Sequence, residues 1–189
     1  GNNILSVNQP VVLQWNNDKG IIFKKIIELD NKYLFRITQE VQNNTKENVE
    51  LYPYAQITRN KIPDDIQNFY ISHEGFIGVF DEELKEDDYD DIEDKKIVRV
   101  ANEGWLGITD KYWMTAVVPK QGENFKSSFL YKNAFKANYI LNNPVLIKPS
   151  SKKSDKLKLF VAAKEVETID AYAANEKINF AIVAEGQSY

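Results

Sequence analysis

The sequence predicts an all-β, mainly antiparallel fold with a short helix near its C-terminal end. Apolar and polar residues alternate through most of the chain, which is the period of a half-buried strand. The segments between these runs are short and rich in Asn and Asp, as in tight turns. No helix-length pattern separates successive strands, so the sequence favours an antiparallel sandwich over βαβ units.

The alternating runs give the expected strands in chain order. In residues 33–41, Phe35 and Ile37 share one face while Arg36 and Thr38 take the other. A proline interrupts the run at 49–58, and because proline cannot donate to a strand ladder, we expect an edge or a bulge there. Further strands are expected at 11–15, 21–29, 75–80, 97–101, 105–108, 113–118, 125–131, 135–141 and 156–163.

The pattern changes near the end of the chain, where apolar residues recur at helical spacing and predict one amphipathic helix over residues 164–176. These residues are Val166, Ile169, Tyr172 and Ala173. The predicted organisation is a β-sandwich at 1–163, a helical element at 164–178 and an unassigned tail at 179–189. The chain starts at Gly1 and its only methionine is Met114, which indicates a piece of a longer protein.

Two polar segments are expected to lie outside the strands. Residues 149–156 have the composition of an exposed loop. Residues 81–94 hold ten acidic side chains in fourteen positions, which favours a solvated surface run. A calcium loop of the EF-hand type needs a central glycine and regularly spaced oxygen ligands, and this segment has neither. We therefore expect no tight metal site here.

Composition argues against several classes of function. A net charge of −4 and a pI near 5.2 disfavour nucleic acid as a partner, because phosphate binding needs a basic face. The absence of cysteine removes disulfides, thiol nucleophiles and thiolate metal ligands. His73 is the only histidine, and the adjacent Glu74 would point to the opposite face of a strand. We expect neither an enzyme nor a cofactor.

The segment at 104–118 combines heavy aromatics with turn residues. Trp105 and Trp113 stand in two apolar arms around a turn at 109–111, and glycines beside the indoles permit close backbone approach. A core hairpin with both tryptophans largely buried is the favoured interpretation, and the rim of a ligand site is the alternative. The residues of this motif are Gly104, Trp105, Gly107, Thr109, Asp110, Tyr112 and Trp113.

Residues 104–119, "GWLGITDKYWMTAVVP", resemble the signature hairpin of the periplasmic domain of the YidC family of bacterial membrane protein insertases. The resemblance continues through 51–59, 69–80, 88–92 and 159–172, in the form typical of alphaproteobacteria. It implies a β-supersandwich resembling galactose mutarotase-like domains, followed by a short helix. It also implies more strands before Val11, so that the sandwich here is N-terminally truncated.

The function that the resemblance implies is that of a non-enzymatic accessory domain at the periplasmic face of the inner membrane. It would assist insertion and folding of membrane proteins with the Sec translocon, contacting SecDF components and nascent membrane proteins through its parent. It would act as a monomer, without nucleic acid, and meet the membrane only through flanking segments. The candidate interaction helix carries Val166, Ile169 and Tyr172. The alternative is a sugar-binding or mutarotase-like domain, which requires His73 and a carboxylate to converge in a pocket.

Overall fold

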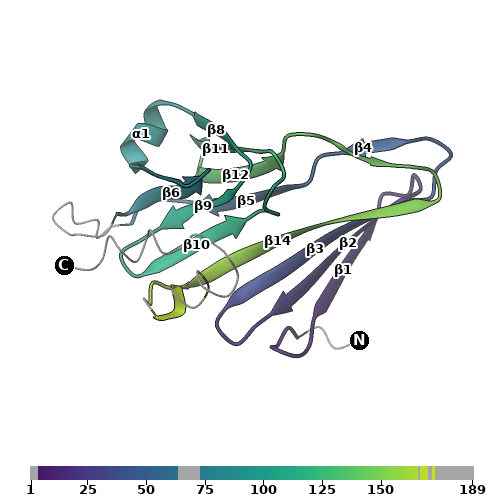
Figure 1. The fold of residues 1–189 in the computed structure, drawn as a ribbon, viewed down its shortest axis with the longest axis horizontal. Coiled ribbons are helices and arrows are strands. Elements are labelled where there is room, and N and C mark those ends of the chain that lie inside the picture. Colours follow the sequence, from purple (N-terminus) through teal and green to yellow (C-terminus); the bar gives the residue numbers. More distant parts are fainter. Residues whose placement is uncertain (1–3, 64–72, 166, 170–171, 173–189) are drawn as a thin grey trace.

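The computed structural model describes residues 4–63, 73–165, 167–169 and 172 of the chain. Within them the chain forms two packed antiparallel sheets and a small outlying pair of strands (Figure 1). The large sheet has the order β1-β2-β3-β14-β10-β9-β6-β7, and the smaller one β5-β12-β11-β8. The strands β13 and β4 pair by themselves. The predicted all-β sandwich is confirmed.

The strands follow the chain with short connections. The large sheet contains β1 (Val11–Asn16), β2 (Ile21–Leu29), β3 (Leu34–Asn43), β6 (Gly75–Phe80), β7 (Glu83–Asp87), β9 (Gly104–Thr109), β10 (Trp113–Val118) and β14 (Ser151–Ala163). The smaller sheets contain β4 (Val49–Leu51), β5 (Tyr54–Arg59), β8 (Ile97–Ala101), β11 (Phe125–Tyr131), β12 (Phe135–Leu141) and β13 (Val145–Ile147). Pro53 lies between β4 and β5, where the run at 49–58 divides.

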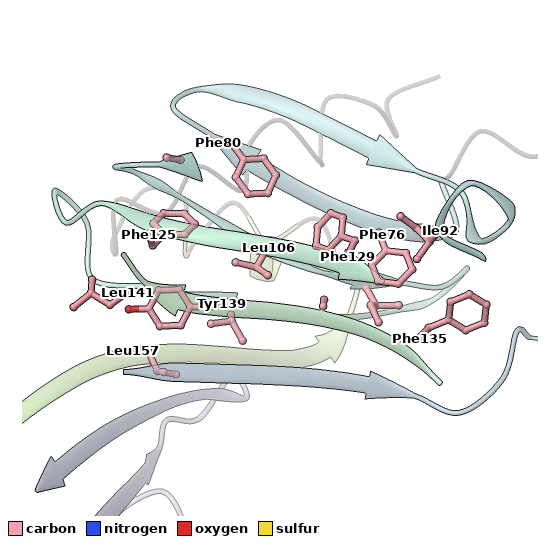
Figure 2. Packing of buried hydrophobic residues seen from close by; sticks show 14 of the residues in the cluster. Phe76, Phe80, Ile92, Leu106, Phe125, Phe129, Phe135, Tyr139, Leu141 and Leu157 are labelled. Carbon is pink, nitrogen blue, oxygen red and sulfur yellow. The ribbon is translucent and has the colours of Figure 1, made fainter. Parts of the chain in front are cut away.

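The first hydrophobic core lies between the two sheets. Phe76 and Phe80 of β6 meet Phe129 of β11, with ring centroids 4.9 Å and 6.4 Å apart. Figure 2 shows these rings with Leu106 of β9 and Tyr139 of β12 in the same layer. All five side chains are buried, because alternate residues of each strand point into this space. Burial of this aromatic layer is the main force joining the sheets.

A second core lies on the opposite face of the large sheet. It contains Trp105, Met114 and Phe160, which come from three adjacent strands. Ile169 and Tyr172, which follow β14 in the chain, are buried in the same cluster. The large sheet is therefore apolar on both faces at β6, β9, β10 and β14, which explains why β6 and β9 are buried at every position.

The acidic segment at 81–94 lies at the surface as expected, with most of its carboxylates exposed, but it is not a loop. It contains the strand β7 and the helix α1 (Tyr89–Asp94), and Tyr89 and Ile92 of that helix are buried. The few apolar side chains among the carboxylates all reach a core: Tyr89 and Ile92 reach the first, and Leu84 packs against the second. Asp90 and Asp91 lie in the first turn of α1, where negative charge is favourable.

The expected loop at 149–156 is also wrong, because β14 begins at Ser151 and its residues 151–160 pair with the full length of β3. Ser151 pairs with Asn43, and Phe160 with Leu34. Backbone pairing with the long strand β3 outweighs the polar composition, since the side chains of Lys152 and Lys153 remain exposed while both residues pair with β3.

An ion pair between Arg99 and Asp87 joins the two sheets near α1. Arg99 of β8 contacts Asp87 of β7 through both guanidinium nitrogens, at 2.7 and 2.8 Å. The guanidinium carbon lies 5.5 Å from the Phe80 ring and 5.6 Å from the Phe129 ring. Charge and stacking together therefore hold Arg99 against the aromatic core.

We expect Arg99→Met to lower the free energy of unfolding by about 3–5 kcal/mol, because it leaves the Asp87 carboxylate buried without its partner. Urea denaturation at neutral pH measures this loss. The double variant Arg99→Met/Asp87→Leu should recover much of it, since no uncompensated charge remains. Equal losses of unfolding free energy in the single and double variants would show that the unpaired Asp87 carboxylate is not the cause of the loss.

Candidate functional site

The hairpin β9–β10 depends on two glycines that admit no side chain. Gly104 has φ +122°, and a Cβ there would lie 1.9 Å from the carbonyl oxygen of Val79. A Cβ on Gly107 would lie 2.2 Å from the carbonyl oxygen of Thr115. Both contacts are with backbone atoms of neighbouring strands, which cannot move aside. The glycines of the motif therefore set the strand spacing beside Trp105.

The two tryptophans of the hairpin have different environments. Trp105 is completely buried in the second core, as predicted. Trp113 is 60% exposed, so the expectation that it is buried is wrong. The register explains the difference, because Met114 pairs with Thr109 and faces the second core, while Trp113 stands one residue earlier and points to the other face. Tyr112 in the turn is 63% exposed.

The turn of the hairpin is anchored from two other elements. Asp110 forms an ion pair with Arg59 at the end of β5. The Tyr89 hydroxyl of α1 lies 3.5 Å from Asp110 Oδ1, and burial raises the pKa of this phenol. Thr109 is buried, and its hydroxyl lies 3.3 Å from the Asp110 carbonyl oxygen. No local pattern points to Arg59 as a partner of this turn, because it lies 51 positions before Asp110.

The segment after β14 docks on the second core. Residues 167–169 are helical, and the amides of Thr168 and Ile169 donate to the Glu165 carbonyl oxygen at 3.0 Å each. Ile169 is buried, and the Tyr172 ring packs edge-on against Phe160 with centroids 5.8 Å apart. Val166, Ala173 and the rest of the predicted helix lie outside the described residues.

A polar contact fixes the same segment to the β2–β3 turn. The Tyr172 hydroxyl lies 2.8 Å from each carboxylate oxygen of Asp30. Asp30 also accepts the amides of Lys32 and Leu34 through Oδ1, at 2.9 and 3.0 Å, so its carboxylate is itself held by the turn. Burial and the Asp30 carboxylate raise the pKa of Tyr172. No local pattern points to this role of Asp30, because its partner Tyr172 lies 142 positions away.

His73 does not take part in an arrangement typical of an enzyme. Its Nε2 lies 2.9 Å from the Phe76 carbonyl oxygen, and its Nδ1 lies 3.7 Å from Asp88 Oδ1. It lines neither of the two cavities described below. Within the described part of the chain, no three His, Cys, Asp or Glu side chains converge to hold a metal ion.

The larger cavity is a groove of about 520 Å³ between the β1–β2–β3–β14 end of the large sheet and the β4–β13 pair. Its walls are mainly apolar, with Trp15 stacked on Phe23 at 5.2 Å. Asp155 lies in it, with Oδ2 buried and without a hydrogen-bond partner. A second cavity of about 290 Å³ is lined by charged and aliphatic residues of β2, β3, β14 and 118–121.

Burial raises the pKa of the Asp155 carboxyl above 3.8. Protonation of this group therefore favours folding, and its stabilising contribution is present below the unfolded-state pKa and lost as the pH rises through the folded-state pKa.

We expect Asp155→Asn to increase the free energy of unfolding at pH 7, with a gain that shrinks as the pH falls towards 3.8. Urea denaturation over this range measures the gain. Asp18→Asn, at an exposed position, is the control; a gain independent of pH would contradict this explanation.

The tryptophans provide a matched pair of substitutions. We expect Trp105→Ala to lower the free energy of unfolding by about 3–5 kcal/mol, because it opens a cavity in the second core. Trp113→Ala, in the same hairpin, should change it by less than about 1 kcal/mol, since the side chain is mostly exposed. Chemical denaturation compares the two. A large loss of unfolding free energy for Trp113→Ala would show that this indole packs against the rest of the protein in solution.

The fold is also found in a solved structure. A galactose mutarotase related enzyme from Lactobacillus acidophilus superposes with a TM-score of 0.54 at 12% identity, over 82% of this chain and 70% of that one. At this identity the likeness concerns the fold alone. It confirms the expected mutarotase-like β-sandwich.

Sequence comparison gives the family. The family model described as "YidC periplasmic domain" matches residues 2–182. The membrane protein insertase YidC of Pelagibacter ubique is 47% identical over 179 residues, and that of Cereibacter sphaeroides 37% identical over 185. These matches cover 95% and 91% of this chain but only 32% and 30% of the relatives. Both relatives are named membrane protein insertases. The chain belongs to the YidC periplasmic domain family.

Proposed function

We propose that this chain is the extracytoplasmic accessory domain of a YidC-type insertase, lying at the periplasmic face of the inner membrane. It acts as a monomer and assists membrane-protein insertion with the Sec translocon, meeting SecDF components and nascent membrane proteins through its parent. The family and the insertase names of the relatives support this assignment. The sugar-binding alternative is not favoured, since His73 lines neither described cavity.

The observation that carries the proposal is the docking of the segment after β14. Ile169 is buried in the second core, and Tyr172 is held both by Phe160 and by Asp30. An isolated helix of this length is marginal in water, so its structure depends on these contacts. The contacts give the chain one direction as it leaves the sandwich at Lys164. We propose that residues 164–178 are a distinct helical element that fixes the position of the β-sandwich relative to the insertase.

The test is Ile169→Asp in the full-length parent protein. A carboxylate at this position would enter an apolar contact, which costs several kcal/mol and should undock the segment. We expect insertion of a reporter membrane protein to fall several-fold while the sandwich stays folded, with new protease cleavage after Ala163. Near-UV circular dichroism of the buried Trp105 reports on the sandwich.

Two controls separate undocking from other effects. Ile169→Leu conserves volume and should keep insertion near the wild-type level. Val98→Asp adds the same charge on β8, where the side chain is 48% exposed, and should also be tolerated. Unchanged insertion in Ile169→Asp, with undocking confirmed by proteolysis, would overturn the coupling role and leave a simple cap on the second core.

A photo-crosslinking amino acid at exposed strand positions of the full-length parent tests the partners. Crosslinks to SecDF or to a nascent membrane protein at neighbouring positions would define a contact surface. Crosslinks only to the parent itself would contradict the proposed partners.

A further inference from the structure

Four exposed side chains gather at one end of the large sheet, and we name them the aromatic rim: Tyr33, Tyr112, Trp113 and Val161. Their exposed fractions are 63%, 63%, 60% and 38%. Three of the four are tyrosine or tryptophan, although an exposed indole is not needed for the stability of the hairpin. The rim is therefore a candidate contact surface.

The members of the rim come from three different strand ends that meet there (Figure 1). Trp113 opens β10 and pairs with Ala163, the last residue of β14. The amide of Val161 donates to the Tyr33 carbonyl oxygen at 3.5 Å. The amide of Lys164 donates to the Tyr112 carbonyl oxygen at 2.8 Å. The rim thus surrounds the point where the chain leaves β14.

Cationic side chains accompany the aromatic rings. The Lys111 ammonium lies 5.2 Å from the centre of the Tyr112 ring, and Lys32 is exposed beside Tyr33. The nearby carboxylates of Asp110 and Asp30 are engaged by Arg59 and by Tyr172. The surface consequently combines amphipathic rings with lysine, the composition that proteins use at the headgroup level of a bilayer.

Glu165 and Glu167 are exposed on the segment that follows the rim. Their charge opposes strong attraction to an anionic surface. The contact must therefore depend mainly on the rings, with lysine providing a smaller electrostatic contribution.

From this arrangement we infer that the aromatic rim rests on the lipid headgroup layer. The inference rests on the proposed function, which places the domain beside the inner membrane. The relatives are named membrane protein insertases and are about three times as long as this match. No described helix of this chain is long and apolar enough to cross a bilayer. The rim gives the domain a membrane contact of its own, in addition to flanking segments. It orients the sandwich with the end of β14 towards the lipid.

Binding to unilamellar vesicles tests this inference. The chain is titrated with phosphatidylcholine vesicles, with or without phosphatidylglycerol, and the bound fraction is measured by co-sedimentation. We expect saturable binding to both, somewhat stronger with phosphatidylglycerol. The double variant Tyr112→Ser/Trp113→Ser should weaken the apparent affinity by roughly tenfold, since two large rings lose their burial in the interface.

Trp15→Ser is the matched control, because Trp15 is 62% exposed but lies on the edge strand β1. It should bind vesicles as the wild type does.

Tryptophan fluorescence gives a second measurement. In a Trp15→Phe variant, lipids brominated near the headgroup should quench the tryptophan fluorescence, and the quenching should disappear when Trp113 is also replaced by Phe.

Equal binding by the wild type and the rim variant, equal loss in the Trp15 control, or no vesicle binding at all would overturn the inference. Crosslinks from Tyr112 to a protein partner together with absent vesicle binding would assign the rim to that protein instead. The Ile169→Asp insertion assay reports on the proposed function separately, because Ile169 lies in the second core and outside the rim.

Discussion

The pairing of β14 with both β3 and β10 is the constraint on which the rest of the structure depends. This strand of thirteen residues pairs with ten positions of β3 on one side and six of β10 on the other. It joins strands whose nearest ends are 70 positions apart in the chain. Leu157 and Leu159 contribute to the core between the sheets, while Phe160 and Ala162 contribute to the core on the opposite face. Loss of this pairing would open both cores at once.

The hairpin and the docked segment have their roles because of this central strand. Gly104 and Gly107 bring β9 close to its neighbours, which lets Trp105 fill the second core beside Phe160. The same core receives Ile169, and the Asp30 carboxylate holds Tyr172 at its border. The motif that resembles the family signature is thus the platform for the segment that leaves the sandwich. A packed platform of this kind has few alternative arrangements, so the docked position is well defined.

Local pattern was sufficient to predict most strands, and long-range contacts explain what it missed. The bounds of β2, β6, β8, β11 and β12 agree with the alternating runs, although Val98 and Val100 of β8 remain exposed. The segment at 81–94 was misassigned because its acidic composition outweighed a few well-placed apolar residues, such as Tyr89 and Ile92. The segment at 149–156 was misassigned because its polar composition gives no sign of the backbone pairing with β3. Trp113 was misplaced because the hairpin register, which decides the face of each residue, depends on the turn. Arg59 and Asp30 could not be found, as their partners are distant in sequence.

The central claim is that contacts with Asp30 and the second core hold the segment after β14 in one position. Amide hydrogen exchange at Ile169 tests it most directly, because this amide donates to the Glu165 carbonyl oxygen only while the segment is docked. The account predicts clear protection in the wild type and a selective decrease in Tyr172→Phe, with the amides of β14 unchanged. Exchange at Ile169 as fast as in an unstructured peptide would contradict the account.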